Sequence, residues 1–529
     1  MLRFSILAPL LASALLLAQV TGQTTFKNPV IYEDFPDNDI TVGPDNAFYF
    51  SASNFHYSPG APILKSFDLV NWQLIGHSIP RLDFGGGYDL PASGERAYRG
   101  GTWASSLRYR KSNKTWYWIG CTNFWNTWVY TAPSVTGPWT RAANIGPGGT
   151  CYYDNGLLFD DDDTPYVVYT KDATVNVAQL AADGLSQVKS VNVVNASMVG
   201  ADSIEGNRLY KINGTYYILN DKPGSTTYIW KSKSPWGPYT SKILVDSIKS
   251  PLNGGGSPHQ GSLVQTPKGD WYYMSFTWAF PSGRLPVLAP IKWGSDGFPV
   301  LVNGANGGWG DSYPMPLNVH AMPNWTTTYT FQGTSLPPTF EWNHNPDTTK
   351  YTVNNSLTLS TASITTDIYS ARNTLTHRVH GEYPVGTVQI DFTNMADGDR
   401  VALAAFRDRS SYIGIHRDGS TYTLTTKFNM TLDEWGGSTL DNGTVVATTK
   451  LPTSSSKKIW LRTNMDVRPD GSNNATFSYS TDGKSFVLLG GTYKLYTGWA
   501  FFLGYRYGIL NWATKALGGS VKVLSFTVA

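Results

Sequence analysis

The chain has 529 residues, a formal net charge of +3 and a charged fraction of 15%. This length allows about two to four domains. No basic run is interleaved with aromatic residues, so nucleic acid is not expected as a partner. After residue 22 no uninterrupted apolar run approaches the ~18 residues of a membrane-spanning helix. No membrane partner is therefore expected either.

Residues 1–22 have the pattern of a secretory signal peptide. Arg3 is the only charge, the apolar run ILAPLLASALLLAQV follows, and VTG places small residues before Gln23. The sequence therefore predicts a secreted, extracellular protein. Eight N-x-S/T sequons fit a glycosylated chain in that compartment. The sequon asparagines are Asn113, Asn195, Asn213, Asn324, Asn354, Asn429, Asn442 and Asn474.

Cys121 and Cys151 are the only cysteines. In the oxidising secretory route they can pair and close a loop of about 30 residues, which would stabilise the fold by about 3 kcal/mol. Two buried thiols are an equal alternative, and the sequence leaves both open. Two cysteines without a matching histidine pair do not indicate a structural zinc site.

An aromatic strand entered by a polar turn recurs five times in the first part of the chain. The copies are GPDNAFYFSAS, KSNKTWYWIGC, DDDTPYVVYT, INGTYYILN and PKGDWYYMSF. Their centres, which follow one another at similar intervals, are Tyr49, Tyr117, Val167, Tyr217 and Tyr272. A repeat of about 50 residues built from short strands is typical of β-propeller blades, whose apolar faces only neighbouring blades can bury. We therefore predict a five-bladed propeller over residues 23–320.

From about Thr326 this periodicity stops. Alternating strands such as SLTLSTA, GTVQIDFT and KIWLRTNM are separated by Gly, Asn and Asp turns. This pattern predicts an antiparallel β-sandwich or jelly roll over residues 326–529. The whole chain is thus expected to be all-β, with PLNVHAMPNWTTTYTF as the segment that joins the two domains.

Three carboxylates precede the strand centres of their blades by nearly equal intervals. Asp37 precedes Tyr49, Asp154 precedes Val167 and Glu205 precedes Tyr217, and the three intervals differ by no more than one position. Because the first strand of each blade lines the propeller axis, we expect the three on one ring. Crowding in a partly dry pocket raises at least one carboxyl pKa, which suits the general acid of glycoside hydrolysis, while a second carboxylate activates water or attacks the sugar. Asp39 shares the strand parity of Asp37 and is an alternative inward residue.

Other acidic residues are assigned to loops and turns. Glu33 and Asp34 are interpreted as loop residues beside the first strand. The run Asp160–Asp163, in DDDDTP, is interpreted as a solvated hairpin tip rather than a calcium site.

These motifs also carry a family resemblance. The segments NPVIYEDFPDNDI, GGTWASSLRYR, YYDNGLLFDDDDTPYVVY, IEGNRLYKINGTYYIL, HQGSLV and GRLPVLAPIKWGSDGFP, in this order, resemble glycoside hydrolase family 43. The later segments FEWNHNPDTTKYTV, ARNTLTHRV and LGYRYGILNWATKALGGSVKV are similar to the concanavalin-like sandwich appended to many xylan-active members. Within the family the chain resembles the fungal arabinoxylan α-L-arabinofuranosidases, with the β-xylosidases as a neighbouring branch.

The resemblance implies a five-bladed, inverting enzyme and a role for each carboxylate. Asp37 resembles the general base that deprotonates water, and Glu205 resembles the general acid. Asp154 resembles the third carboxylate, which positions the acid and keeps its pKa elevated. Inversion implies that the carboxyl groups of Asp37 and Glu205 lie about 6.5–9.5 Å apart. Arg284, in GRLPV, resembles the arginine that reaches the sugar in the pocket.

The resemblance further implies substrate-binding and ion-binding residues. Trp103 and Phe55 resemble aromatic pocket residues, with ordinary packing as the alternative. Tyr153, beside Asp154, would form a wall that selects between side-chain and backbone sugars. His259 resembles the axial histidine near an ion in the propeller channel, with a hydrogen-bonded core histidine as the alternative. No cofactor is required for the chemistry, and the implied ion is a structural calcium.

The leading interpretation is a secreted α-L-arabinofuranosidase, monomeric, that removes arabinose side chains from plant cell-wall arabinoxylan. A β-xylosidase acting on xylo-oligosaccharides is the alternative among enzymes. A non-catalytic, lectin-like polysaccharide binder is the alternative of another class, although a binder has no need for three carboxylates facing the axis. Five-bladed fructan hydrolases are set aside because their NDPNG type of motif is absent.

Overall fold

The structure, a computed structural model, describes residues 24–92, 94–451 and 456–529. The signal peptide predicted at residues 1–22 lies outside them. In the described part no helix has the length and apolar character needed to cross a membrane. The helices found there are five short 3-10 helices: η1 (Gly86–Asp89), η2 (Pro147–Gly149), η3 (Ala196–Val199), η4 (Thr348–Lys350) and η5 (Ile368–Ser370).

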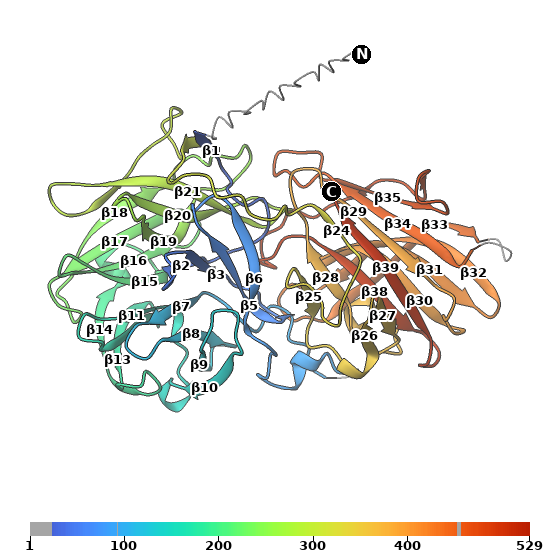
Figure 1. The fold of residues 1–529 in the computed structure, drawn as a ribbon, viewed down its shortest axis with the longest axis horizontal. Coiled ribbons are helices and arrows are strands. Elements are labelled where there is room, and N and C mark those ends of the chain that lie inside the picture. Colours follow the sequence, from blue (N-terminus) through green and yellow to red (C-terminus); the bar gives the residue numbers. More distant parts are fainter. Residues whose placement is uncertain (1–23, 93, 452–455) are drawn as a thin grey trace, which may run out of the picture.

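Five four-stranded antiparallel sheets follow one another along the chain and form the blue-to-yellow half of Figure 1. Blade 1 contains β2 (Asp39–Val42), β3 (Phe48–Ser51), β5 (Gly60–Ser66) and β6 (Trp72–Ile79). Blade 2 contains β7 (Ser105–Arg110), β8 (Thr115–Thr122), β9 (Asn126–Ala132) and β10 (Thr140–Asn144). Blade 3 contains β11 (Tyr153–Phe159), β12 (Pro165–Lys171), β13 (Thr174–Leu180) and β14 (Gln187–Asn195). Blade 4 contains β15 (Glu205–Ile212), β16 (Thr215–Lys222), β17 (Thr226–Ser232) and β18 (Thr240–Asp246), and blade 5 contains β19 (His259–Gln265), β20 (Trp271–Trp278), β21 (Arg284–Trp293) and β22 (Pro299–Leu301).

The first strands of the blades form the hub of a closed ring. β2 contacts β7, β7 contacts β11, β11 contacts β15, β15 contacts β19, and β19 contacts β2 again. The predicted centres lie on the second strand of every blade, where aromatic side chains are buried between neighbouring sheets. The five-bladed propeller is therefore confirmed. Outside the blades, β1 (Thr25–Lys27) pairs with β23 (Ser312–Pro314).

The yellow-to-red half of Figure 1, together with the early strand β4, is a sandwich of two large antiparallel sheets. One sheet has the order β26-β27-β39-β29-β34-β35-β36, with β24 beside β39 and β37 beside β35. Its strands are β24 (Thr327–Tyr329), β26 (Tyr351–Val353), β27 (Leu357–Ser360), β29 (Val385–Asp391), β34 (Lys458–Met465), β35 (Asn474–Ser480), β36 (Val487–Leu488), β37 (Tyr493–Lys494) and β39 (Ser520–Val528). The other sheet has the order β33-β32-β31-β30-β38-β28-β25-β4. Its strands are β4 (Tyr57–Ser58), β25 (Phe340–Asn343), β28 (Leu375–Arg378), β30 (Asp399–Phe406), β31 (Arg409–Asp418), β32 (Thr421–Leu432), β33 (Thr439–Lys450) and β38 (Arg506–Ala513).

The two domains share a sheet and a buried charge cluster. β4 leaves blade 1 and pairs with β25, so the propeller supplies the edge strand of a sandwich sheet. Next to this edge Glu341 is fully buried and accepts hydrogen bonds from Arg378 at 2.9 Å and from Arg506. His77 of blade 1 lies 2.8 Å from the same carboxylate. Burial disfavours the charged form of Glu341, but the two arginines outweigh it and hold its pKa well below the usual value.

Replacing Glu341 by glutamine is expected to lower the free energy of unfolding by about 3–5 kcal/mol at neutral pH, because it leaves two buried arginines without their anion. A carboxyl whose pKa is depressed in the folded state contributes stability above its unfolded-state pKa and loses it as the pH falls. The difference between wild type and variant in urea unfolding should therefore shrink on the acid side. The control is Asp397→Asn, which breaks the exposed pair with Lys515. Equal effects of the two variants would contradict a structural role for the buried cluster.

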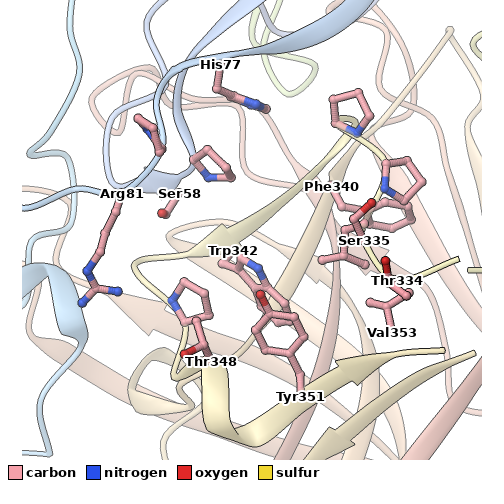
Figure 2. A pocket seen from close by; sticks show the side chains of 16 residues that line it. Ser58, His77, Arg81, Thr334, Ser335, Phe340, Trp342, Thr348, Tyr351 and Val353 are labelled. Carbon is pink, nitrogen blue, oxygen red and sulfur yellow. The ribbon is translucent and has the colours of Figure 1, made fainter. Parts of the chain in front are cut away.

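A hollow of about 350 Å³ lies beside this junction. Figure 2 shows His77 and Arg81 of the propeller on one side and Phe340, Trp342 and Tyr351 of the sandwich on the other. None of the three predicted catalytic carboxylates lines it. This hollow is therefore separate from the candidate active site.

The structure pairs Cys121 with Cys151 in a disulfide, with the Cα atoms 5.2 Å apart. The bond joins the end of β8 in blade 2 to the residues that enter β11 in blade 3. Of the two alternatives that the sequence leaves open, the structure has the disulfide. It anchors the chain just before Tyr153, at the edge of the candidate site.

Candidate active site

The three predicted carboxylates lie at the hub, where the first strands of blades 1, 3 and 4 begin. Asp37 precedes β2, Asp154 is the second residue of β11, and Glu205 is the first residue of β15. Asp37 and Asp154 have left-handed backbone conformations, with φ of 58° and 47°, which aspartate adopts more readily than most residues. Gly206, next to Glu205, has φ of 69°.

β-Bulges lie beside two of these side chains, those of Asp154 and Glu205. The register of β11 shifts between Tyr153 and Gly156, and the register of β15 shifts directly after Glu205. Such bulges re-aim side chains and are frequent beside active sites. When the left-handed residues are aligned, Glu205 lies one position earlier than Asp37 and Asp154. The nearly equal spacings in the sequence therefore mark the same end of each blade, but not the same backbone position.

Asp37 is held between two donors. Arg284 donates from Nη1 to Oδ1 at 2.7 Å, and Ser53 donates from Oγ to Oδ2 at 2.6 Å. Asp37 is only 7% exposed. The arginine offsets the charge of the carboxylate, and the two hydrogen bonds fix its orientation.

Glu205 shares this charged environment. The Tyr153 hydroxyl donates to Oε2 at 3.2 Å. Burial, and then the charge of Asp37, raises the pKa of Glu205 to about 7, against opposing effects from Tyr153 and Arg284. Glu205 is therefore protonated in a large fraction of molecules near neutral pH, as a general acid must be.

Asp154 lies deeper and is held by the backbone. The amide of Gly206 donates to its Oδ2 at 2.9 Å, which links this carboxylate to the residue after Glu205. Burial, followed by the charges of Glu205 and Asp37, raises the pKa of Asp154 well above the usual value. The three carboxylates thus influence one another, and the predicted cluster is brought together.

The predicted arginine lies under aromatic rings from both domains. The Arg284 guanidinium is 5.8 Å from the ring centre of Phe55 and 5.8 Å from that of Phe502 in the sandwich. Phe55 and Phe502 stack on each other, with ring centres 6.0 Å apart and 8° between their planes. Asp34 accepts from the amide of Arg284 at 2.7 Å and from the amide of Gly504 at 2.9 Å. The sandwich therefore helps to position Arg284.

Asp34, interpreted from the sequence as a loop residue, also has a structural role. Asp34 does lie in a loop, but it is buried and joins the propeller to the sandwich. Gly504 permits this approach, since a Cβ there would lie 1.9 Å from the carbonyl oxygen of Ser282. Sequence reasoning missed Asp34, Phe502 and Gly504 as site residues. The resemblance quoted around LGYRYG was the available signal, but it did not indicate that this segment reaches the pocket.

Trp103 and Tyr153 form an aromatic group beside Glu205. Their ring centres are 6.1 Å apart, and Phe124 packs against both, at 4.3 Å from Trp103 and 5.7 Å from Tyr153. Trp103 donates from its indole nitrogen to the carbonyl of Arg99 at 2.9 Å. The predicted aromatic residues are thus close to the acid, and Phe124 is an addition that the sequence did not indicate.

Asp39, the alternative to Asp37, lies below the site in a structural ion pair. It is fully buried, lies 3.3 Å from Arg208 Nε and accepts from Arg108 at 2.6 Å. Arg208 also donates to the carbonyl of Asp37 at 2.9 Å. Asp39 therefore stabilises the hub, and Asp37 is the carboxylate beside Arg284.

Asp221 is a further buried carboxylate at the hub, and sequence reasoning missed it. It lies directly opposite Glu205 in the pairing of β15 with β16. It is fully buried, and neither carboxylate oxygen has a hydrogen-bond partner in the described part of the chain. Burial, and then the charges of Glu205, Asp154 and Asp37, raises its pKa well above the usual value. In the sequence it is a single aspartate after an apolar run, so nothing marked it.

His259 starts β19 and is buried between aromatic rings. Its ring centre is 5.3 Å from that of Phe276 and 5.5 Å from that of Trp278, and Nδ1 lies 2.8 Å from the carbonyl of Ser257. Burial lowers its pKa to about 4, so the ring is neutral. Within the described residues no three His, Cys, Asp or Glu side chains are grouped to hold a metal ion. The surroundings of His259 match those of a packed, hydrogen-bonded histidine.

The arrangement provides the parts that glycoside hydrolysis needs. Glu205 has a raised pKa, Asp37 is paired with an arginine, and the two belong to different blades, so a bond could be attacked from one side and protonated from the other. Aromatic rings from the propeller and the sandwich surround the group, which limits access of water.

Comparison with known proteins agrees with this chemistry. The family model described as glycosyl hydrolases family 43 matches residues 26–299. A second model, the β-xylosidase C-terminal concanavalin A-like domain, matches residues 328–528. The two matches cover the propeller blades and the sandwich.

Individual proteins match the whole or about half of the chain. A β-xylosidase of Formosa agariphila is 26% identical over 570 aligned positions, which cover 96% of this chain and 90% of that protein. A non-reducing end α-L-arabinofuranosidase of Bacteroides ovatus, BoGH43B, is 33% identical over 322 positions, which cover 56% of each chain. Among solved structures, a GH43 enzyme engineered to display both endo-xylanase and exo-arabinofuranosidase activity is 42% identical, with a TM-score of 0.91 and coverage of 96% of this chain and 100% of that one.

Proposed function

The chain belongs to family 43 of the glycosyl hydrolases, and from this membership we propose that it is an α-L-arabinofuranosidase that removes arabinose side chains from arabinoxylan. Enzymes of this family are inverting and need no cofactor for their chemistry. The support for arabinose is that the engineered enzyme, 42% identical along the whole chain, and the Bacteroides ovatus relative both have arabinofuranosidase activity. A substrate of the xylan type agrees with these relatives and with the β-xylosidase of Formosa agariphila.

In the proposed mechanism Asp37 takes a proton from water as the water attacks the anomeric carbon. Glu205 gives its proton to the departing xylan oxygen in the same displacement, so the anomeric configuration inverts. Asp154 is not in contact with the departing oxygen; its hydrogen bond from the Gly206 amide positions Glu205, while burial and the charge of Asp37 keep the pKa of the acid high. Arg284 orients Asp37 and donates to the sugar.

The observation that carries this proposal is the contrast between Glu205 and Asp37. The pKa of Glu205 is raised to about 7, while Asp37 has an arginine and a serine as hydrogen-bond donors. Two carboxyl groups in one site, one with a raised pKa and one held by an arginine and a serine, suit the roles of acid and base. A lectin-like binder has no use for that difference.

The test is NMR of products as they are released from wheat arabinoxylan. Arabinose as its initial β-anomer supports the proposal, because an inverting enzyme turns an α-linkage into a β-product. Release of xylose from xylobiose, without arabinose from arabinoxylan, would replace it with the second candidate. That candidate, a β-xylosidase, is supported by the Formosa agariphila relative, which aligns with 96% of this chain.

Replacing Tyr153 by phenylalanine is expected to shift the alkaline limb of the pH–kcat profile to higher pH. The acid must be protonated, so activity falls as the pH rises through its pKa of about 7. The Tyr153 hydroxyl bonds the charged form of Glu205 and lowers that pKa. Removing the hydroxyl should therefore raise the pKa. Tyr117→Phe is the matched control. The Tyr117 hydroxyl accepts a hydrogen bond from Asn113 and donates one to the carbonyl of Asp183. A limb that moves to lower pH, or moves equally in both variants, contradicts the assignment.

Tyr153 is also proposed as the wall that selects the sugar. Its ring is anchored by Phe124 and Trp103 beside the acid, so its bulk narrows the space next to the departing oxygen. Replacing it by alanine should widen that space and increase the release of backbone products relative to arabinose, measured by chromatography of arabinoxylan digests.

Secretion, glycosylation and a monomeric state are also proposed. The N-terminal segment 1–22 has a signal-peptide pattern, and the Cys121–Cys151 disulfide is typical of oxidising compartments. All eight sequon asparagines are exposed, as glycan acceptors must be. The mass of protein recovered from culture medium, before and after deglycosylation, tests the first two proposals, and size-exclusion chromatography tests the third.

A structural calcium ion in the propeller channel stays a prediction. His259 is packed between rings and bonded to a backbone carbonyl, and the residues that the structure describes hold no three-residue metal cluster. His259 and its neighbours therefore fit a calcium ion poorly. Thermal unfolding of chelator-treated protein, with and without added calcium, tests the prediction through stability rather than activity.

A further inference from the structure

Three tryptophans stand apart from the rest by their exposure. All 19 tryptophans lie within the described residues, and the most exposed are Trp125 at 72%, Trp435 at 62% and Trp499 at 47%. They belong to three separate loops: the β8–β9 turn of blade 2, the β32–β33 hairpin of the sandwich, and the segment between β37 and β38 of the sandwich. Exposed aromatic surface of this kind marks binding sites when it is grouped.

Trp125 adjoins the wall beside the acid. It follows Phe124, whose ring packs on Trp103 at 4.3 Å and on Tyr153 at 5.7 Å. The amide of Trp125 donates to the carbonyl of Thr122 at 3.2 Å, which closes a turn. The turn therefore holds Trp125 at the edge of the pocket.

Trp435 is attached to the same edge through Arg99. The Arg99 guanidinium lies 4.0 Å from the ring centre of Trp435 and 4.8 Å from that of Phe502. Arg99 also donates to the carbonyl of Glu434 at 3.0 Å, and its own carbonyl accepts from Trp103. One propeller residue thus holds rings from two sandwich loops beside a pocket residue.

Trp499 continues the edge on the side of Arg284. Its ring stacks on Trp278 of β20, with centres 5.5 Å apart and 28° between the planes. It lies 5.7 Å from Phe502, which stacks on Phe55. Trp435 and Trp499 are therefore one arginine or one ring contact away from Phe502 beside the carboxylate site, and Trp125 adjoins the site as the chain neighbour of Phe124.

We propose that Trp125, Trp435 and Trp499 form a platform, shared by both domains, that binds the backbone of a β-1,4-linked xylan chain while its side-chain sugar enters the carboxylate site. This rests on the proposed function. An arabinose in the pocket is still attached to the xylan chain, so that chain must lie across the edge of the pocket. The three tryptophans lie along this edge, so the platform is continuous with the site. Indole rings bind the flat faces of neutral pyranose rings, and three rings on separate loops suit several consecutive sugars.

The test uses the Glu205→Gln variant, which cannot hydrolyse the ligand. The ligand is linear xylohexaose, which has no arabinose branch to enter the pocket. Calorimetry should show that adding Trp435→Ala or Trp499→Ala weakens binding by roughly tenfold, the loss expected for one aromatic stacking contact. Trp125→Ala, at the most exposed position, should weaken it as well and keeps the test independent of the sandwich loops. Tyr383→Ala is the matched control, because Tyr383 is also exposed and also stacked under an arginine, Arg468 at 4.5 Å.

Weaker binding in the tryptophan variants, with the Tyr383 variant unchanged, supports the platform. Unchanged xylohexaose binding in all three tryptophan variants overturns the platform. It is also overturned if size-exclusion chromatography shows a wild-type dimer that the tryptophan substitutions dissociate while xylohexaose binding stays the same. Thermal unfolding midpoints confirm that the variants are folded. Failure of the proposed function is distinguishable, since it appears in the sugar released by wild-type enzyme, whereas the platform is measured as affinity for an uncleaved chain.

Discussion

Glutamine in place of Glu205 is expected to lower kcat on arabinoxylan by about 10²–10⁴-fold, the usual contribution of a general acid. The departing xylan hydroxyl is a poor leaving group and needs the proton. An aryl arabinofuranoside with an acidic phenol needs none, so its kcat should change far less. The burial and the Asp37 charge that raise the pKa of Glu205 act on a carboxyl and not on an amide, so the alkaline limb of the pH profile should also disappear.

Asp202→Asn provides the control for this substitution. Asp202 is exposed and lies in the loop that leads into β15, just before Glu205. Its replacement by asparagine removes the same formal charge. Its activity on both substrates should equal that of wild type. An equal loss on arabinoxylan and on the aryl glycoside in the Glu205 variant would show that Glu205 is not the acid.

The blades could be predicted because each one repeats a local signal. The second strand of each blade is buried and aromatic, as in Phe48–Ser51, and a polar turn precedes it. Strand alternation likewise predicted the sandwich. The pairing of Tyr57–Ser58 with β25 could not be predicted in this way, since so short a strand has no period and its partner lies in the other domain, far along the chain.

The site residues that could be predicted are those whose position in the blade repeat is itself a signal. Asp37, Asp154 and Glu205 precede recognisable strands, so their end of the blade followed from the repeat. The contributions of Asp34 and Asp221 depend on distant partners: Asp34 meets Gly504 across the domain junction, and Asp221 meets Glu205 only through strand register. No local pattern encodes either contact.

The hairpin tip of DDDDTP was only half predicted. Asp161 and Asp162 are exposed, as expected for a solvated turn. Asp160 instead pairs with Lys211 at 2.5 Å and Asp163 with Arg110 at 2.5 Å. These partners lie on the neighbouring blades 4 and 2, so the turn joins three blades, which the pattern within a single blade does not reveal.

Asparagine in place of Asp37 is expected to lower kcat by about 10²–10⁴-fold on arabinoxylan and, unlike the Glu205 change, equally on the aryl arabinofuranoside. The attacking water must lose its proton whatever the leaving group is, so a better leaving group cannot replace the base. The asparagine oxygen can still accept from Arg284 or Ser53, which donate at 2.7 and 2.6 Å in the wild type. The fold should therefore persist, and the thermal midpoint should confirm it.

Asp39→Asn separates this catalytic effect from a structural one, because Asp39 lies close to Asp37 in the chain but faces Arg208 and Arg108. Breaking that largely buried cluster should cost about 3–5 kcal/mol of unfolding free energy, and any loss of kcat should follow the loss of folded protein. The two aspartates thus predict opposite results: activity lost with stability kept for Asp37, and stability lost first for Asp39. If the Asp39 variant were stable and inactive while the Asp37 variant hydrolysed both substrates normally, the base would be Asp39, and the carboxylate paired with Arg284 would serve only to hold the arginine.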